Sequence, residues 1–369
     1  MKNLVRVSRC MLLLSESDVR SCLPVPAAIE ANRKALGSLR LKRDGGAEVP
    51  TRVGLPYFGK DDAAEANSGV KSAADWTLFK PAAYYPPKHE GTGDGIIMRM
   101  KLVSVRSDNP SVGKPTVPAT VMMVDAISGQ VSAILGATYL TAARTASGSA
   151  IATEICTSHL NGPINLVVFG AGLQAELHID AIRCVKKVGK ITIVNRTRER
   201  AERLKSVTLA KAEKNIFSAD IDTVLLGDDR GVMQALKEAD VICTTTNAST
   251  PLFPSEWVKT GCHVNGVGSY TAEMEEIDSN FSSTRCQVVV DTQEAINVGD
   301  LKSLSFSSSN FVGLLGDVIS GNAHIRPCSE EGPDCTFFKS VGTAIQDVIT
   351  AHAVMETALA RGIGTEFEM

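Results

Sequence analysis

A glycine-rich turn in the middle of the chain has the residue types that bind the phosphates of a nucleotide. The segment Gly170-Ala-Gly-Leu-Gln-Ala175 follows the pattern G-x-G-x-x-A. The first glycine allows a tight turn, the second lets the backbone approach a pyrophosphate, and the small last residue lets helix and strand pack closely. Loops also match this short pattern by chance, so a structural turn is the alternative. The predicted dinucleotide-binding residues are Gly170, Gly172, Leu173, Gln174 and Ala175.

The segments around this turn have the strand–turn–helix order that such a fingerprint requires. Leu166–Phe169 is a short apolar run, typical of a strand buried on both faces of a parallel sheet. The residues after the turn have helical apolar spacing, and the N–H groups at the start of that helix attract phosphate. The α/β alternation continues to Asp291, which indicates a parallel sheet. Further strands are expected at 190–194, 222–226, 241–245, 263–267 and 288–291, and helices at 201–212 and 231–238.

The end of the second strand bears on the choice of nucleotide. NAD-specific folds carry an acidic residue there that binds the ribose 2′-hydroxyl, but this chain has Asn195-Arg-Thr197. A guanidinium such as that of Arg196 binds a 2′-phosphate well, so we predict NADPH rather than NADH. The alternative is a solvated arginine at a strand end. Candidate cofactor neighbours at the ends of later strands, each of which is also ordinary for a loop, are Thr246, Asn247, Gly266 and Gly268.

The first part of the chain is predicted to be mostly β and carries three candidate anion-binding residues. Arg52 lies in an extended segment, Lys101 in a strand at 96–105, and Arg144 near the start of a helix at 139–152. A cation near a helix start opposes the helix dipole, which hints at a ligand role for Arg144. Taken singly, each could be a surface or structural charge. The other expected elements are a strand at 11–14, helices capped by Ser15 and opened by Pro26, and a hairpin of 116–124 with 131–135; most of 59–95 has no assignment.

Composition narrows the class of protein. A length of 369 residues suggests about two domains, and a net charge of −3 provides no basic face for nucleic acid. The nine cysteines form no C-x-x-C pair, so we expect free thiols in the cytosol; a Cys328–Cys335 bridge is the exception considered. No apolar run is long enough to span a membrane, and no residue cluster has metal-ligand spacing.

Four motifs occur in the order Arg144–Thr153, Gly170–Ala175, Asn195–Thr197 and Phe338–Gly342. Together they resemble the ornithine cyclodeaminase/mu-crystallin family. The resemblance implies an α/β fold in which a Rossmann domain, residues 146–334, is inserted in a β-rich α+β domain, residues 1–145 plus 335–369, that binds substrate and forms a homodimer. It also implies that Arg52, Lys101 and Arg144 hold a substrate carboxylate, and that Lys71 only superficially matches the lysine motif.

One departure from the family pattern affects the expected reaction. Ornithine cyclodeaminases have an aspartate where this chain has Tyr270, and a phenol with a pKa of about 10 is a poor base at neutral pH. The segment that begins at Gly268 looks like the branch of the family that reduces cyclic ketimines. Lys101 or a water is the expected proton donor, with Tyr270 a weaker candidate. Lys339 and Asp347 are expected to be structural or pocket-forming, and His89, His178 and His324 structural or exposed.

The expected function is therefore NADPH-dependent reduction of a cyclic ketimine carboxylate, such as Δ1-piperideine-2-carboxylate or Δ1-pyrroline-2-carboxylate, to the cyclic amino acid. Three alternatives stay open at this point. They are a dehydrogenase of amino acids or N-substituted amino acids, an ornithine cyclodeaminase, and a non-catalytic protein that binds NADPH and a carboxylic acid. The expected partners are a small carboxylate or imine substrate and a second copy of the chain.

Overall fold

The computed structural model describes residues 10–41, 44–57, 75–87, 95–214, 219–302, 309–326 and 333–368. The chain forms two compact units, and the second is inserted in the first. Unit 1 consists of Met1–Thr141 and Thr343–Met369, and unit 2 of Ala142–Gly342. Lys71, His89 and Cys328, which the sequence analysis considered, lie outside the described residues.

Unit 1 is built on a mixed sheet with the strand order β16-β1-β7-β6-β5-β4-β2, and β3 also pairs with β4. Its neighbours are antiparallel except for β1 and β7, which run parallel. The predicted hairpin is confirmed as β6 and β7. The strands are β1 Cys10–Leu14, β2 Ala47–Glu48, β3 Val53–Tyr57, β4 Asp75–Tyr84, β5 Ile97–Val105, β6 Ala119–Asp125, β7 Val131–Gly136 and β16 Thr365–Glu368.

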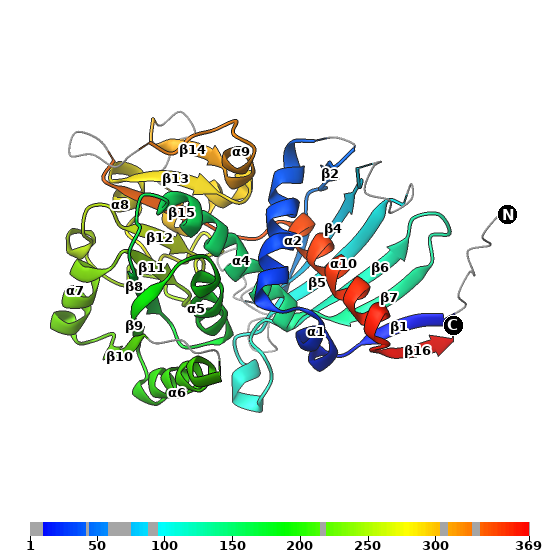
Figure 1. The fold of residues 1–369 in the computed structure, drawn as a ribbon, viewed down its shortest axis with the longest axis horizontal. Helices are drawn as coiled ribbons and strands as arrows, with labels where there is room; N and C mark the ends of the chain where they lie inside the picture. The colour runs from blue at the N-terminus through cyan, green and yellow to red at the C-terminus, as the bar shows by residue number, and fades with distance from the viewer. Residues whose placement is uncertain are drawn as a thin grey trace, which may run out of the picture. The chain divides into compact units, whose positions relative to one another are not determined.

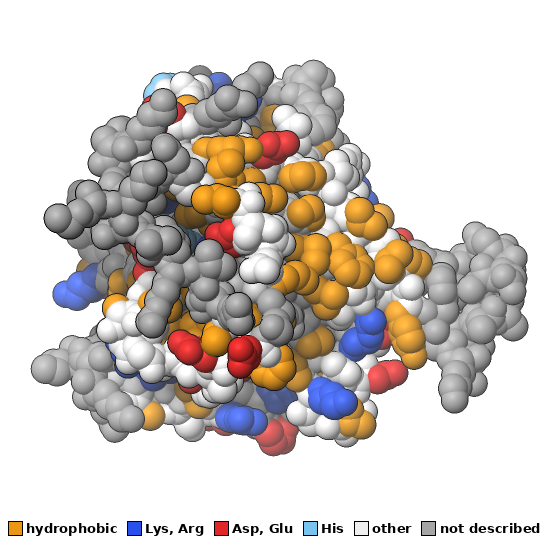
Figure 2. All heavy atoms as spheres, turned by 90° about the vertical axis from the view of Figure 1, so that its right-hand side faces the viewer, with side chains coloured by type: hydrophobic (Ala, Val, Ile, Leu, Met, Phe, Trp, Pro, Cys, Tyr) orange, Lys and Arg blue, Asp and Glu red, His pale blue; other side chains and the backbone are white. Residues whose placement is uncertain are grey.

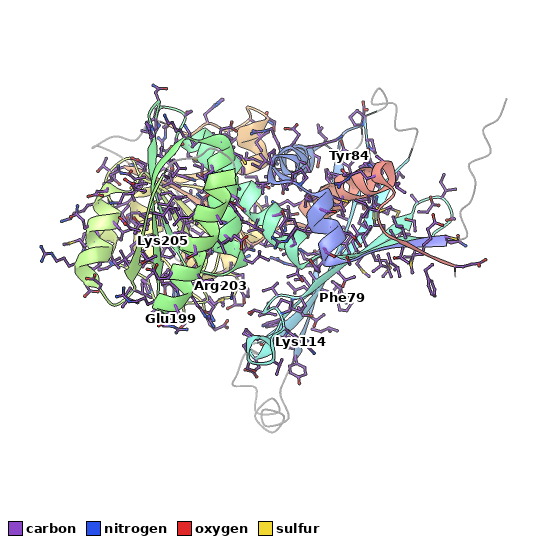
Figure 3. All side chains as sticks on the ribbon, turned by 60° about the horizontal axis from the view of Figure 1, so that its bottom comes forward. Phe79, Tyr84, Lys114, Glu199, Arg203 and Lys205 are labelled. Carbon is purple, nitrogen blue, oxygen red and sulfur yellow. The ribbon has the colours of Figure 1, made fainter. Side chains whose placement is uncertain are left out.

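Helices α1 Glu16–Cys22, α2 Val25–Gly37 and α10 Ala344–Arg361 belong to the same unit, and α2 and α10 lie over one face of the sheet (Figure 1). Ser15 caps α1 through a capping box, as its sequence predicts. Tyr84 of β4 packs with Ile345 and Val348 of α10 in one apolar cluster, beside α10 in Figure 3. The first turn of α10 also reaches the middle of β4 and β5, where Asp347 contacts Lys80 and Lys101.

Unit 2 contains a fully parallel sheet with the strand order β10-β9-β8-β11-β12-β15-β13-β14. Successive residues of β8 belong to different apolar clusters, with Val168 in one and Phe169 in the other, so the strand is buried on both faces as predicted. The strands are β8 Ile164–Phe169, β9 Val188–Asn195, β10 Asp220–Leu225, β11 Val241–Thr244, β12 His263–Gly266, β13 Cys286–Val290, β14 Phe311–Leu314 and β15 Cys335–Lys339.

The order of the strands reverses at β8, because β9 lies on one side of it and β11 on the other. In parallel sheets, ligands bind outside the carboxyl ends of the strands at such a switch point. The described helices of this unit are α4 Thr138–Cys156, whose first residues belong to unit 1, α5 Leu173–Val185, α6 Arg198–Lys214, α7 Asp229–Glu238, α8 Ser279–Thr284 and α9 Leu315–Ile319.

Two sequence predictions about the elements are wrong, and one strand lies in the stretch that we left without assignment. That strand is the ten-residue β4, whose residues 76–84 pair with β5. Residues 288–291 are not the last strand of the parallel sheet, since β14 and β15 follow. Residues 335–342, assigned to the first domain, lie in unit 2, because β15 inserts between β12 and β13. The units change at 141/142 and 342/343 instead of 145/146 and 334/335.

Two fully buried histidines connect elements of unit 2. His178 of α5 lies 2.7 Å from the carbonyl of Gln174 and 3.0 Å from the hydroxyl of Ser149 in α4, so its Nδ1 carries the proton and Nε2 accepts. His263 of β12 has the other tautomer, because its Nε2 donates to the side-chain oxygen of Asn265 at 3.3 Å and its Nδ1 accepts from the hydroxyl of Thr336 in β15 at 2.8 Å. Desolvation lowers the pKa of both histidines to about 4. They are structural and neutral, as expected for His178.

Because of these histidines, we expect the folded protein to lose stability in acid. A folded pKa of about 4 lies below the unfolded value of 6.5, so their contribution is complete above pH 6.5 and is lost as the pH falls toward 4. Each should remove on the order of 2 kcal/mol of unfolding free energy between pH 7 and pH 5. Urea unfolding of His178→Gln at both pH values should show a smaller loss than the wild type. The exposed His159→Gln serves as the control, and an equal loss in all three proteins would refute the assignment.

Candidate active site

The glycine turn after β8 lies at the switch point of the parallel sheet. Gly170 has a φ of +109°, and a Cβ there would lie 2.7 Å from Oγ1 and 3.0 Å from the carbonyl oxygen of Thr245, at the end of β11. Both the backbone conformation and the close approach therefore require glycine. Gly172 is the N-cap of α5, is exposed, and has open space where a Cβ would be.

The start of α5 provides backbone donors at this turn. Gly172 has no side chain to cap the helix, and the first described intrahelical bond is from the N–H of Glu176 to the carbonyl of Gly172. The N–H groups of Leu173, Gln174 and Ala175 thus have the position in which helix starts bind anions. The side-chain Oε1 of Gln174 is buried without a hydrogen-bond partner. The turn thus has the geometry of a helix start whose N–H groups are open to an anion.

The end of β9 places the residues expected to select the nucleotide. The side chain of Asn195 donates to the carbonyl of Thr197 at 2.9 Å, which holds the turn into α6. Arg196, between them, is exposed. Because β9 is the neighbour of β8, Arg196 follows the strand next to the glycine turn. Further exposed charged residues follow on α6, such as Glu199 and Arg203 (Figure 3).

Glu276, which the sequence analysis did not select, joins two of the expected cofactor loops. One carboxylate oxygen accepts from the N–H and hydroxyl of Thr246 at 2.5 and 2.7 Å, and the other accepts from the N–H of Gly268 at 2.7 Å. Glu276 is fully buried, and burial together with the nearby Asp300 raises its pKa. Nothing in its local sequence indicates this role, because its partners are 8 and 30 residues away.

A second buried carboxylate supports the first. Asp300 accepts from the N–H groups of Glu276 and Ile277 at 2.7 and 3.0 Å and from the ammonium of Lys339 at 2.7 Å. Lys339 is fully buried, and Asp300 is its partner in the structural role that we expected for it. Through Asp300, the end of β15 is thereby linked to the segment at Glu276.

At two of the predicted cofactor positions, Gly266 and Gly268, close packing by itself requires a glycine. A Cβ on Gly266 would lie 2.5 Å from the ring of Phe337, and one on Gly268 would overlap the carbonyl oxygen of Thr246. Thr246 is half-buried and Asn247 is exposed. These loops lie at the carboxyl ends of β11 and β12, where the sheet topology places ligands.

Arg144 belongs to unit 2, on the second turn of α4, and is only 5% exposed. Its guanidinium lies against Gly342, because a Cβ at that position would be 2.7 Å from Cζ of Arg144. Gly342 ends the Phe338–Gly342 motif.

In unit 1, Lys101 of β5 is buried and contacts the first turn of α10. Its ammonium lies 2.6 Å from one carboxylate oxygen of Asp347 and 3.4 Å from the hydroxyl of Thr141. Lys80 of β4, directly opposite Lys101 in the sheet, lies 3.8 Å from the other oxygen of Asp347 and is 3% exposed. The sequence analysis missed Lys80, although a lysine between Phe79 and Pro81 in an apolar run was the available signal.

The remaining predicted residues, Arg52 and Tyr270, belong to different units. Arg52 is half-buried and comes directly before β3, in the same sheet as Lys101. Tyr270 is half-buried in the loop after β12 of unit 2. The three predicted carboxylate-binding residues are therefore divided between the units, with Arg52 and Lys101 in unit 1 and Arg144 in unit 2. Within the described parts of the chain, no group of three or more His, Cys, Asp or Glu is arranged to hold a metal.

A model of the ornithine cyclodeaminase/mu-crystallin family matches residues 86–362. The chain belongs to this family. It is 32% identical over 365 residues to a Delta(1)-pyrroline-2-carboxylate reductase of Bacillus cereus strain ATCC 10987, covering 97% of this chain and 100% of the relative. It is also 31% identical over 308 residues to the ketimine reductase mu-crystallin of Mus musculus, covering 84% of this chain and 90% of the relative.

A solved structure of a family member is similar over nearly the whole chain. It is the Delta(1)-pyrroline-2-carboxylate reductase of Thermococcus litoralis in complex with NADH and L-proline, with a TM-score of 0.78 and 26% identity. The match covers 96% of this chain and 99% of that chain. The comparisons confirm the family predicted from the ordered motifs and the α/β fold class.

The two glycines of the turn should respond differently to alanine. Gly170→Ala should lower the free energy of unfolding by about 2 kcal/mol, because it places a side chain in left-handed backbone and against Thr245. Gly172→Ala should change it by less than about 0.5 kcal/mol, because its Cβ would be in open space. Equal losses in denaturant unfolding of the two variants would contradict the geometry.

Proposed function

We propose that this protein reduces a cyclic ketimine carboxylate, of the Δ1-piperideine-2-carboxylate or Δ1-pyrroline-2-carboxylate type, to the cyclic amino acid with NADPH. The observation that carries the proposal is the similarity over 97% of the chain to a relative named for the reduction of such an imine. The chain also has the groups that this reaction needs, namely a glycine turn for the nucleotide and buried cations for a carboxylate.

The basic residues would bind and orient the substrate. Arg52 and Arg144 offer planar forks that match a carboxylate, and Lys101 offers a compact charge. Asp347 lies 2.6 Å from Lys101 and fixes the direction of its ammonium. Lys101 would attract the substrate carboxylate and would supply the proton that the imine nitrogen needs. We assign the catalytic role to Lys101, with a water as the alternative proton source.

The nucleotide would bind at the carboxyl ends of the strands of unit 2. The residues proposed to hold it are Gly170–Ala175, Asn195–Thr197, Thr246, Asn247, Gly266 and Gly268. When bound, NADPH supplies the hydride that the imine carbon accepts. Glu276 would keep the loops at Thr246 and Gly268 in one arrangement, since it accepts hydrogen bonds from both. A prearranged site places hydride and imine in register, which is a large part of the rate gain in such reactions.

The first test follows NADPH oxidation with the two cyclic ketimines as acceptors. We expect saturable oxidation with at least one of them, and a loss of kcat/KM of about 100-fold in Lys101→Met because a buried cation and proton source is removed. Lys114→Met is the matched control, since Lys114 is exposed in the loop after η2 Asn109–Val112 of the same unit (Figure 3).

Other outcomes of this assay would replace the proposal. Oxidation only with pyruvate and an amine would indicate a reductase that forms N-substituted amino acids. Ammonia release from ornithine without net oxidation would indicate a cyclodeaminase, despite Tyr270. Saturable NADPH binding without turnover of any imine would indicate a binding protein.

The second test concerns the preference for NADPH. Arg196 is exposed at the end of β9 and would pair with the 2′-phosphate. Arg196→Ala should raise the Kd for NADPH about tenfold and change the Kd for NADH less than about twofold, as measured by fluorescence titration. Arg198→Ala, two residues further and also exposed, should leave both values unchanged. An unchanged ratio of the two Kd values in Arg196→Ala would make the NADPH assignment wrong.

We also propose that the protein is a homodimer. Unit 1 exposes apolar side chains on β3 and β5, where Val53, Leu55 and Met98 are 58%, 54% and 41% exposed. Figure 2 shows hydrophobic side chains gathered across the face that it presents. A second copy is the partner that would cover such a surface. We place the protein in the cytosol, because buried thiols outside disulfides, such as Cys22, Cys243 and Cys262, suit a reducing compartment. Among the described residues, no helix has the length and apolar character needed to cross a membrane.

A further inference from the structure

The segment after β15 forms one wall of the space that holds the Arg144 side chain. Gly342 has a φ of +78°, and its Cα faces the guanidinium so closely that any Cβ would overlap it. The wall is backbone, not side chain, so its position depends on what holds the loop 340–342. Arg144 has four rotatable side-chain bonds, and a fixed wall reduces the positions that its guanidinium can take.

Asp291 holds this loop. It follows β13, is fully buried, and lies beside the end of β15 because the two strands pair. Its Oδ2 accepts from the hydroxyl of Ser340 at 2.8 Å and from the N–H of Gly342 at 2.7 Å, and its Oδ1 accepts from the N–H of Val341 at 3.2 Å. Hydrogen bonds to a carboxylate are stronger than those between neutral groups. One buried charge therefore fixes three consecutive residues.

We propose that Asp291 is a positioning residue for substrate binding, which acts by fixing the loop 340–342 and thereby the guanidinium of Arg144. The inference rests on the proposed function in one respect, namely that Arg144 binds the substrate carboxylate. It assigns a role to the Phe338–Gly342 motif that the proposed reaction does not otherwise use. Binding sites gain affinity when the interacting group is held before the ligand arrives.

The kinetic test is a double-mutant cycle between Asp291→Asn and Arg144→Lys. The asparagine nitrogen cannot accept the bonds that one carboxylate oxygen accepts, so the loop should loosen. Asp291→Asn should raise the KM for the ketimine about tenfold, change kcat less than about threefold, and leave the Kd for NADPH unchanged. If Asp291 acts through Arg144, the double variant should have the same KM as Arg144→Lys alone. Effects that multiply in the double variant would overturn the inference.

A matched control separates positioning from general stability. Asp240 also holds a loop of unit 2, since it accepts from the N–H of Asn165 at 2.7 Å and from Lys259 at 2.6 Å. Asp240→Asn should lower the Tm and leave the KM unchanged. If Asp291→Asn does not fold, Ser340→Ala removes one bond to the same carboxylate; it should raise the KM about threefold, again with no further rise on top of Arg144→Lys. An unchanged KM in Ser340→Ala would then count against the inference.

Crystal structures of the wild type and Asp291→Asn, or Ser340→Ala if that variant is needed, test the same inference without any turnover. We expect an ordered Arg144 guanidinium against Gly342 in the wild type and a displaced or multiply placed guanidinium in the variant. An unchanged guanidinium in the variant would overturn the inference even if ketimines are reduced. If the wild type reduces no ketimine, the proposed function fails, and the position of the guanidinium alone decides whether Asp291 positions Arg144.

Discussion

Buried carboxylates hold the candidate site together. In unit 2, Glu276 joins the loops after β11 and β12, Asp300 supports Glu276 and pairs with Lys339, and Asp291 fixes the loop after β15. In unit 1, Asp347 contacts Lys101. Each of these acids accepts hydrogen bonds from residues that are distant in sequence. Hydrogen bonds to buried carboxylates thus help to hold the loops that surround the proposed ligands.

This arrangement has a physical cost and a physical advantage. Removing a carboxylate from water is unfavourable unless donors replace the lost hydration, and here backbone N–H groups, hydroxyls and lysines do so. The raised pKa of Glu276 reflects its burial and the neighbouring Asp300. In return, strand-end loops that would otherwise be mobile have one arrangement. A site for hydride transfer needs such order, because its two reactants must meet at a defined distance.

Much of the fold was predictable because local patterns carry it. The apolar run of β8, the glycines after it and the amphipathic α5 lie within about 20 residues, so the nucleotide turn is visible without any tertiary information. The strand β4 was not visible, because its alternation is weak and its pairing with β5 defines it. For the same reason, we predicted that the chain returns to the first domain already at β15. Only strand pairing shows to which sheet β15 belongs.

The sequence by itself determined the family, the parallel α/β sheet, the glycine turn and the identities of Arg52, Lys101 and Arg144 as candidate anion-binding residues. The tertiary structure alone showed that Lys80 shares Asp347 with Lys101, that Glu276 joins two loops and that Gly342 lies against Arg144. The physical reason is distance along the chain. Propensity, periodicity and turn chemistry act over a few residues, whereas these contacts join residues that only the packing of strands and helices brings together.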